Sequence, residues 1–192
     1  MSLKKTLLRW ALGKEKAEAL RVAKIVRSPD RVVLVERYLP AFAAAGGRML
    51  WVGCQAYTAD YPARLEAGGG EVWTLEFDPA AAVWGREGRH RTGDIKEVET
   101  IFAGMRFDAI LCNGVLGFGV DTPADQRAAL SAMVDVLDPG GRLLLGWNTD
   151  RILDPVSEGI VAHPFVPAAL GPLPQRMTFP TVTHVFDLFE RM

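Results

Sequence analysis

Acidic and polar residues follow the short apolar runs of this sequence, at the positions where buried strands would end. Glu76 ends the run EVWTLE, and Asp78 comes two residues later, directly before Pro79. One carboxylate can accept hydrogen bonds from both hydroxyls of a ribose diol, so an acid at this place suits a nucleotide site. A solvated loop acid or a helix cap in front of Pro79 is the alternative interpretation. The other candidates at run ends are Gly53, Cys54, Gln55, Asp94, Asn113, Gly114, Trp147, Asn148 and Asp150.

The histidines are the side chains that change charge near neutral pH. His90 lies in a charged Arg-His-Arg segment and His163 precedes a proline, so we interpret both as surface residues. His184 opens an alternating segment, and it and Asp150 are the candidate general bases. Three histidines and two cysteines fall in no metal-ligand spacing, so no metal site is predicted. The sequence also lacks the Gly-x-x-x-x-Gly-Lys phosphate loop and the Gly-x-Ser-x-Gly elbow.

The elements that must position these residues alternate regularly from Arg48 onward. The pattern predicts strands over 49–52, 71–76, 89–92, 107–112, 143–147 and 184–189, and helices over 60–67, 79–84, 95–102 and 123–137. Such alternation means parallel strands joined by right-handed crossovers. We therefore expect an α/β fold: a doubly wound, mostly parallel seven-stranded sheet with helices on both faces. In the expected order the first and fourth strands are neighbours, which brings Cys54 and Cys112 to one edge of the sheet.

The first 47 residues differ from the rest because apolar residues recur there at helical spacing. We predict that 1–47 form an N-terminal helical extension and that 48–192 form the main domain. Pro40 interrupts the apolar stretch 32–45, so one kinked helix and two short helices both fit the pattern.

Composition limits the classes of protein that fit. The chain has 192 residues, of which 49% are hydrophobic and 23% charged, and this balance excludes wholesale disorder. A net charge of −1 gives no electrostatic reason to bind nucleic acid or an anionic membrane. No apolar run approaches the roughly 20 residues that span a bilayer. With two distant cysteines and no secretory signal, the sequence predicts a cytoplasmic domain without nucleic-acid or membrane partners.

Five segments in this order resemble the successive motifs of class I S-adenosylmethionine-dependent methyltransferases, with a Rossmann-like fold. They are MLWVGCQAYT, WTLEFDPAAA, TGDI, FDAILCNGVLGFG and VLDPGGRLLLGW, and they cover residues 48–148. The resemblance implies that 48–192 bind S-adenosylmethionine, with Gly53 opening the cofactor loop, Glu76 holding the ribose hydroxyls and Asp94 near the adenine. The cofactor-binding residues it implies are Gly53, Cys54, Gln55, Tyr57, Glu76, Phe77, Asp94, Ile95, Asn113 and Gly114.

The loop after the first strand departs from the family pattern. The family's loop reads Gly-x-Gly-x-Gly, whereas this one reads Gly53-Cys54-Gln55-Ala56-Tyr57. It is similar to a branch of the family with a Gly-Cys-x-x-Tyr-Thr loop, so we interpret it as a variant. The missing glycines leave open whether the backbone still approaches the cofactor closely.

The resemblance implies methyl transfer to a small-molecule acceptor, because the chain has no insertion large enough to recognise a macromolecule. If the acceptor group is a hydroxyl, His184 or Asp150 is the expected base. The alternative is a catalytically silent methyltransferase-like domain that binds the cofactor or a protein partner. A nicotinamide-dependent oxidoreductase shares the fold but would need Gly-x-Gly-x-x-Gly, which is absent. The N-terminal helices could cover the cofactor as a lid or pack on the sheet.

Overall fold

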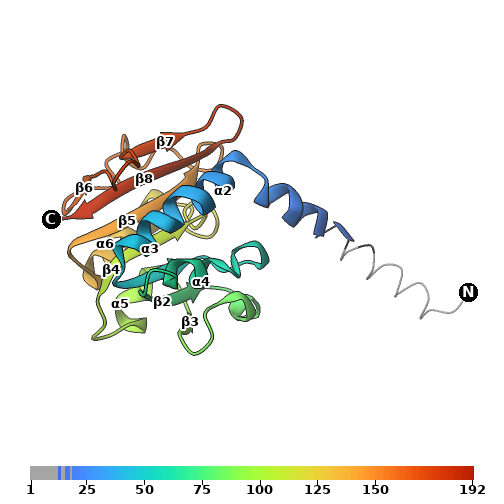
Figure 1. The fold of residues 1–192 in the computed structure, drawn as a ribbon. Coiled ribbons are helices and arrows are strands. Elements are labelled where there is room, and N and C mark those ends of the chain that lie inside the picture. The colour runs from blue at the N-terminus through green and yellow to red at the C-terminus, as the bar shows by residue number, and fades with distance from the viewer. Residues whose placement is uncertain (1–12, 14–15, 18) are drawn as a thin grey trace, which may run out of the picture.

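A central sheet with helices on both faces forms the body of the protein in the computed structural model (Figure 1). The structure describes residues 13, 16, 17 and 19–192, so the predicted helix before residue 13 lies outside the described residues. The helices are α2 (Pro29–Val33), η1 (Leu34–Tyr38), α3 (Leu39–Ala45), η2 (Ala56–Thr58), α4 (Tyr61–Glu66), η3 (Pro79–Trp84), η4 (Ile95–Glu97), α5 (Val98–Ile101) and α6 (Pro123–Val136). The strands are β1 (Arg48–Val52), β2 (Glu71–Glu76), β3 (His90–Thr92), β4 (Phe107–Asn113), β5 (Leu137–Asn148), β6 (Phe165–Pro167), β7 (Arg176–Thr178) and β8 (His184–Arg191).

The strands follow the order β3-β2-β1-β4-β5-β8-β6, and β7 pairs with β8 beside this path. The first five of them are parallel, whereas β6, β7 and β8 join antiparallel. The predicted mostly parallel, doubly wound sheet is therefore confirmed, with eight strands in place of the seven expected, and so is the pairing of the first and fourth strands. Val52 lies opposite both Leu75 and Cys112, so the carboxyl ends of β1, β2 and β4 meet at one edge. Cys112 and Cys54 are buried free thiols.

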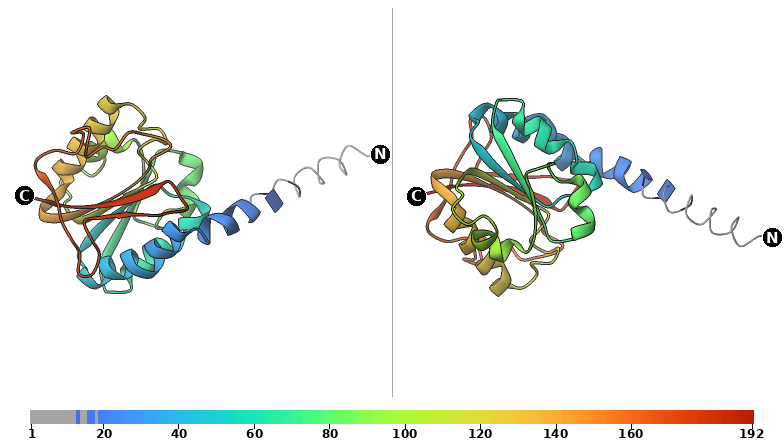
Figure 2. Two further views of the ribbon diagram at one scale, coloured as in Figure 1. Left: turned by 90° about the horizontal axis from the view of Figure 1, so that it is seen from above. Right: turned by 90° about the horizontal axis from the view of Figure 1, so that it is seen from below.

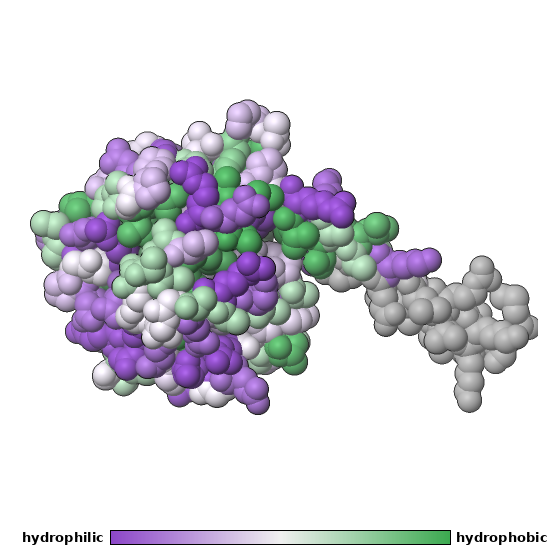
Figure 3. All heavy atoms as spheres, in the orientation of Figure 1, coloured by the Kyte–Doolittle hydropathy of each residue, from purple (hydrophilic) through white to green (hydrophobic). Residues whose placement is uncertain are grey.

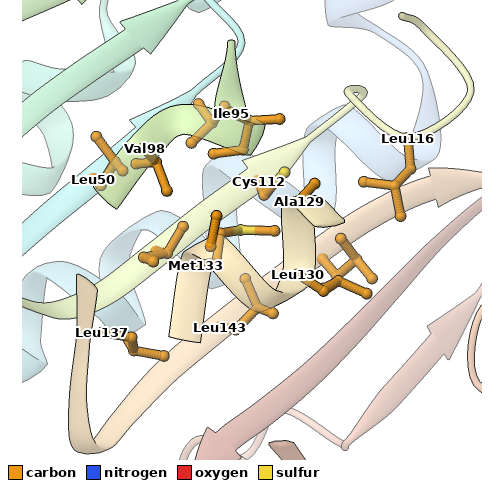
Figure 4. Packing of buried hydrophobic residues seen from close by; sticks show 14 of the residues in the cluster. Leu50, Ile95, Val98, Cys112, Leu116, Ala129, Leu130, Met133, Leu137 and Leu143 are labelled. Atoms are coloured by element: carbon orange, nitrogen blue, oxygen red, sulfur yellow. The ribbon is translucent and has the colours of Figure 1, made fainter. Parts of the chain in front are cut away.

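Hydrophobic side chains on both faces of the sheet explain why β1 and β4 are continuous apolar runs. On one face, α6 packs Leu130 and Met133 against Cys112 and Leu143, and Ile95 and Val98 extend the same core (Figure 4). On the other face, Leu34, Leu39 and Phe42 pack with Trp51 and Leu111. Figure 2 shows the two helical layers on either side of the sheet.

The helical stretch around Pro40 is one continuous helix from Pro29 to Ala45 with a π-helical turn at Leu34–Tyr38. Proline has no N–H and clashes with the carbonyl four residues before it. The wider turn, in which the Leu39 N–H donates to the Leu34 carbonyl, accommodates the proline without breaking the helix.

The structure differs from the predicted elements in the following places. The segment 79–84 is a 3₁₀ helix in which Ala81 is buried. Gly85, which follows it, packs closely on His90: a Cβ added at Gly85 would lie 2.2 Å from His90 Nδ1. The fifth strand begins at Leu137 instead of 143, because α6 ends at Val136 and the chain already pairs with β4 there. The strands β6 and β7 were not predicted, because their segments are short and proline-rich and become strands only by pairing with the edge of β8.

Before α2, residues 19–26 continue as a helix that projects from the body (Figures 1 and 2). Leu20 is 72% exposed, and Figure 3 shows hydrophobic residues on this projecting helix. In the described part of the chain no helix is long and apolar enough to cross a membrane.

Candidate functional site

A cavity of about 600 Å³ opens at the carboxyl ends of β1, β2 and β4. Its volume lies within the range of small-molecule sites, and its place is where open parallel sheets bind ligands. Nine of the ten residues that the resemblance implies for cofactor binding line it, and their role there stays a prediction. They are Gly53, Gln55, Tyr57, Glu76, Phe77, Asp94, Ile95, Asn113 and Gly114.

Gly53 is required where β1 enters the cavity wall. Its φ of +94° is a left-handed conformation that disfavours other residues. A Cβ at this position would also lie 3.0 Å from the Asn113 carbonyl oxygen at the end of β4. Glycine at 53 therefore brings the ends of the two strands together beneath the cavity.

The variant loop keeps its shape without further glycines. Gln55 is extended, with φ of −143°, and its N–H donates to the Thr58 hydroxyl at 2.9 Å. That hydroxyl donates to the Gln55 carbonyl at 3.0 Å, so Thr58 secures the turn. The other residues of this loop thus have backbone conformations that any amino acid can adopt.

Cys54 departs from its predicted place in the site, because its side chain is fully buried and does not line the cavity. Burial, reinforced by the Glu76 charge, raises the pKa of the thiol to about 12, so it is neither a nucleophile nor a base. Its contribution comes from the backbone, where its N–H donates to Glu76 Oε2 at 2.7 Å.

Glu76 is held by two backbone groups at the rim of the cavity. Its Oε2 accepts from the Cys54 N–H, and its Oε1 accepts from the Asp78 N–H at 3.0 Å. Each carboxylate oxygen has a second lone pair, so Glu76 can still accept from two ligand hydroxyls. Asp78, the rival acid, is exposed and instead caps η3 by accepting from the Ala80 N–H at 2.9 Å.

Asp94 lies further along the same wall and is partly occupied by local contacts. Its Oδ1 accepts from the Lys96 N–H at 2.9 Å, which caps η4. The Lys96 ammonium lies 3.5 Å from Asp94 Oδ2 and 2.9 Å from Asp125 Oδ1. Asp94 can thus still accept hydrogen bonds from a ligand in the cavity, but its charge is paired with Lys96.

The helices before β1 contribute cationic residues that sequence reasoning missed. Arg21 and Arg31 line the cavity, and the guanidinium of Arg31 lies over the Tyr57 ring, 5.3 Å from its centroid. The Arg31 side chain is only 12% exposed and pairs with Asp30 at 3.5 Å. From sequence alone, arginines in an amphipathic helix are interpreted as charges on its solvent-exposed face. Only their position in the fold shows that they belong to the site.

The two candidate bases do not line the cavity. Asp150 is exposed, and hydrogen bonding from Thr183 keeps the pKa of its carboxyl below its usual range. His184 is only 2% exposed, and its Nδ1 lies 3.1 Å from Asn148 Oδ1. Burial is the main cause that lowers the pKa of His184 to about 4, with Arg31 lowering it further. A direct general-base role for either residue thus lacks the required contact with the cavity.

A cofactor with an adenosine and an amino-acid part fits the donors and acceptors of this cavity. Glu76 offers acceptors for a ribose, Phe77 is 72% exposed at the rim beside it, and Asn113 and Gly114 line the cavity at the end of β4. In the described residues, no group of three or more His, Cys, Asp or Glu side chains is placed to hold a metal ion.

Comparison with known proteins agrees with this geometry. A family model described as a methyltransferase domain matches residues 50–145, half of the chain. The ubiquinone/menaquinone biosynthesis C-methyltransferase UbiE of Klebsiella pneumoniae subsp. pneumoniae is 31% identical over 110 residues, which are 53% of this chain and 42% of that protein. The chain therefore spans less than half the length of the curated relatives that it matches.

Solved structures share the fold. The N-methyltransferase NodS from Bradyrhizobium japonicum WM9 superposes with a TM-score of 0.65 at 17% identity, over 86% of this chain and 98% of that one. CalS10 from Micromonospora echinaspora, an amino pentose methyltransferase solved with S-adenosylmethionine bound, gives a TM-score of 0.50 at 30% identity, over 72% and 59%. With its fold, its cavity and the matched half of its sequence, the chain belongs to the methyltransferase domain family, in the class I S-adenosylmethionine-dependent group.

Proposed function

We propose that the protein transfers a methyl group from S-adenosylmethionine to a hydroxyl group of a small molecule. The bond from the methyl carbon to the sulfur breaks as the bond to the hydroxyl oxygen forms, which releases S-adenosylhomocysteine, and the hydroxyl proton passes to solvent. The observation that carries the proposal is the Glu76 carboxylate, which two backbone N–H groups fix at the rim of the cavity with lone pairs to spare. The Glu76 carboxylate is thus already oriented before the ligand arrives, so binding loses little conformational entropy at this side chain.

S-adenosylmethionine supplies a methyl group that is already activated on a sulfonium, so the protein must mainly align donor and acceptor and exclude water. In this chain Gly53 lets the backbone approach the cofactor, Glu76 holds the ribose hydroxyls, and Asp94 and Ile95 lie at the adenine end. Gly114 and the backbone of Asn113 border the amino-acid end, at the carboxyl end of β4.

The size of the cavity supports a small acceptor. About 600 Å³ suits a drug-sized ligand and a compact partner beside it, not a macromolecular surface. The 30% identical relative CalS10 acts on an amino pentose by its name, which makes sugars with hydroxyl and amino groups suitable test compounds.

A labelled-donor assay tests the proposal. Purified protein is incubated with methyl-labelled S-adenosylmethionine and a panel of pentoses, amino pentoses and other hydroxylated metabolites, with Glu76→Ala as the matched control. We expect label on a hydroxyl-bearing compound with the wild-type protein and at least tenfold less with the variant. Cofactor binding without transfer to any compound would instead support a silent methyltransferase-like domain.

A further inference from the structure

Three neighbouring strands bring a buried histidine and two amides together at the part of the cavity formed by β4 and β5. Asn113 ends β4, Asn148 ends β5, and His184 begins β8 directly opposite Asn148. Asn113 and Asn148 line the cavity, whereas His184 lies behind them. We call Asn113, Gly146, Asn148 and His184 the amide wall.

The orientation of the Asn148 amide sets the tautomer of His184. In the structure Asn148 Nδ2 lies 3.0 Å from the Thr183 hydroxyl, and Oδ1 faces His184. With this orientation the ring nitrogen 3.1 Å from Oδ1, Nδ1, carries the proton, because a carbonyl oxygen only accepts. Nε2 then presents a bare lone pair, which is fully buried and has no partner among the described residues.

Asn113 is the matching half of this arrangement. It is 5% exposed, and in the described part of the chain neither its Oδ1 nor its Nδ2 has a hydrogen-bond partner. A Cβ on Gly146 would lie 2.0 Å from Asn113 Oδ1 and 2.9 Å from His184 Nε2. The end of the Asn113 side chain and the unpartnered nitrogen of His184 therefore both lie over Gly146, where an added side chain would clash with them.

Leaving these atoms unsatisfied is costly, because each buried polar group has given up its hydrogen bonds to water without gaining a partner. Rotation of the Asn113 amide would place Nδ2 where Oδ1 now lies, near Gly146 and on the side of His184 Nε2, so that its N–H could donate to that nitrogen. The same rotation would place Oδ1 at the buried position of Nδ2, beside the cavity that Asn113 lines.

We propose that His184 is a positioning residue, which orients the amides of Asn113 and Asn148 from behind so that Asn113 Oδ1 accepts a hydrogen bond from the hydroxyl that receives the methyl group. This inference rests on the proposed methyl transfer and names the part of the site that holds the acceptor. It also gives His184 a role that needs no contact with the acceptor.

The lowered pKa of His184 agrees with this role. The groups that face it from α2 are Arg31, which lowers its pKa, and Asp30, which raises it, and burial outweighs both. A neutral imidazole keeps Nε2 free to accept from Asn113 at pH 7.

The first test is nitrogen NMR of the ¹⁵N-labelled protein, with and without S-adenosylhomocysteine. We expect His184 to be a neutral Nδ1–H tautomer at pH 7, with an Nε2 shift that moves toward the value of a free lone pair in Asn113→Ala. A protonated ring, an Nε2–H tautomer or an Nε2 shift indifferent to Asn113→Ala would overturn the proposal. This readout decides the positioning even if no acceptor is found.

The second test compares His184→Gln with His184→Ala on a hydroxyl acceptor from the labelled-donor panel. The Gln amide can replace Nε2 as an acceptor but cannot take up a proton, so we expect kcat/KM within about threefold of wild type for Gln and at least tenfold lower for Ala. Equal losses in both variants would overturn positioning in favour of proton transfer. Affinity for S-adenosylhomocysteine should stay within about twofold in both variants, and a tenfold fall would reassign the amide wall to the cofactor. Failure of wild-type protein to transfer label would count against the proposed function and leave the NMR result to decide the positioning.

Discussion

The two sides of the cavity differ in how their polar atoms are prepared. On the cofactor side, Glu76 is already bonded to two backbone N–H groups close to it in the fold. On the amide wall, Asn113 and His184 Nε2 are buried without partners. The cofactor side is therefore preorganised in the protein alone, whereas the amide wall completes its hydrogen bonds only by rotation of an amide or by contact with a ligand.

The two sides also differ in how the chain builds them. The cofactor side comes from a loop and strand end within residues 53–78, joined by Glu76 to the Cys54 N–H. The amide wall joins residues 113, 146 and 184, which meet only because β5 lies between β4 and β8. A change behind the amide wall should therefore affect stability and turnover but leave cofactor affinity intact.

The largest effect is expected at Arg176 of β7, which pairs with Asp187 of β8 and with Asp154 in the segment after β5. Its guanidinium donates to Asp187 at 2.6 and 2.9 Å and to Asp154 at 2.6 and 2.9 Å, and Asp187 is 2% exposed. Arg176→Ala leaves that buried carboxylate with only the Trp147 N–H, so the free energy of unfolding should fall by about 3 kcal/mol.

Urea denaturation at pH 7.5 measures this change. Arg64→Ala, which breaks an exposed pair with Asp60, is the matched control and should cost less than about 1 kcal/mol. If Arg176→Ala lowers the free energy of unfolding no more than Arg64→Ala does, water replaces Arg176 as the partner of Asp187. The affinity for S-adenosylhomocysteine should be unchanged in both variants.

The next effect is a pH dependence that His184 causes. Its pKa is lowered to about 4 in the folded protein, against about 6.5 when unfolded, so the unfolded chain takes up the proton first as pH falls. The stabilisation is complete above about pH 7 and is lost on acidification, by about 2 kcal/mol at pH 5. The free energy of unfolding is measured at pH 7 and pH 5 for the wild-type protein and for His184→Gln. The difference between the two proteins isolates the contribution of His184, because both keep His90 and the carboxylates. Parallel pH curves for the two proteins would contradict a buried neutral imidazole.

The smallest effect is expected at Asp150. It is exposed, it does not line the cavity, and the Thr183 hydrogen bond that lowers its pKa makes it a weaker base. Asp150→Asn should change turnover by less than about threefold, like Asp135→Asn on the exposed face of α6, whereas loss of a general base costs about 10²–10⁴-fold. A fall of that size in initial-rate assays would restore Asp150 as the base.

The contrast between the two sides explains what could be predicted from sequence. The sheet order and the helices on both faces follow from apolar runs of strand length between amphipathic segments, and the structure confirms them. Glu76 could be placed at the cavity because it ends a strand and its neighbours in sequence build the loop around it.

Other features could not be predicted, because they depend on contacts distant in sequence. Gly146 sits in an ordinary apolar strand, and only the strands on either side of it show why a side chain there would clash. Arg31 looks like a charge on a solvated helix until the helix is placed over Tyr57. Cys54 was predicted at the cofactor from its position in the loop, but its side chain turns into the core and only its N–H serves the site.

Calorimetry with S-adenosylhomocysteine tests the central claim most directly. Wild-type protein should bind it, and Glu76→Ala should weaken binding at least tenfold, since one hydrogen bond to a charged group contributes about 1.5–3 kcal/mol. Asp78→Ala, which removes only a cap of η3, should lower the affinity by less than about threefold. Glu76→Gln keeps an acceptor for the Cys54 N–H and so controls for a change in the shape of the loop. Heat from a nicotinamide dinucleotide with none from S-adenosylhomocysteine, or equal affinity in wild type and Glu76→Ala, would contradict the account.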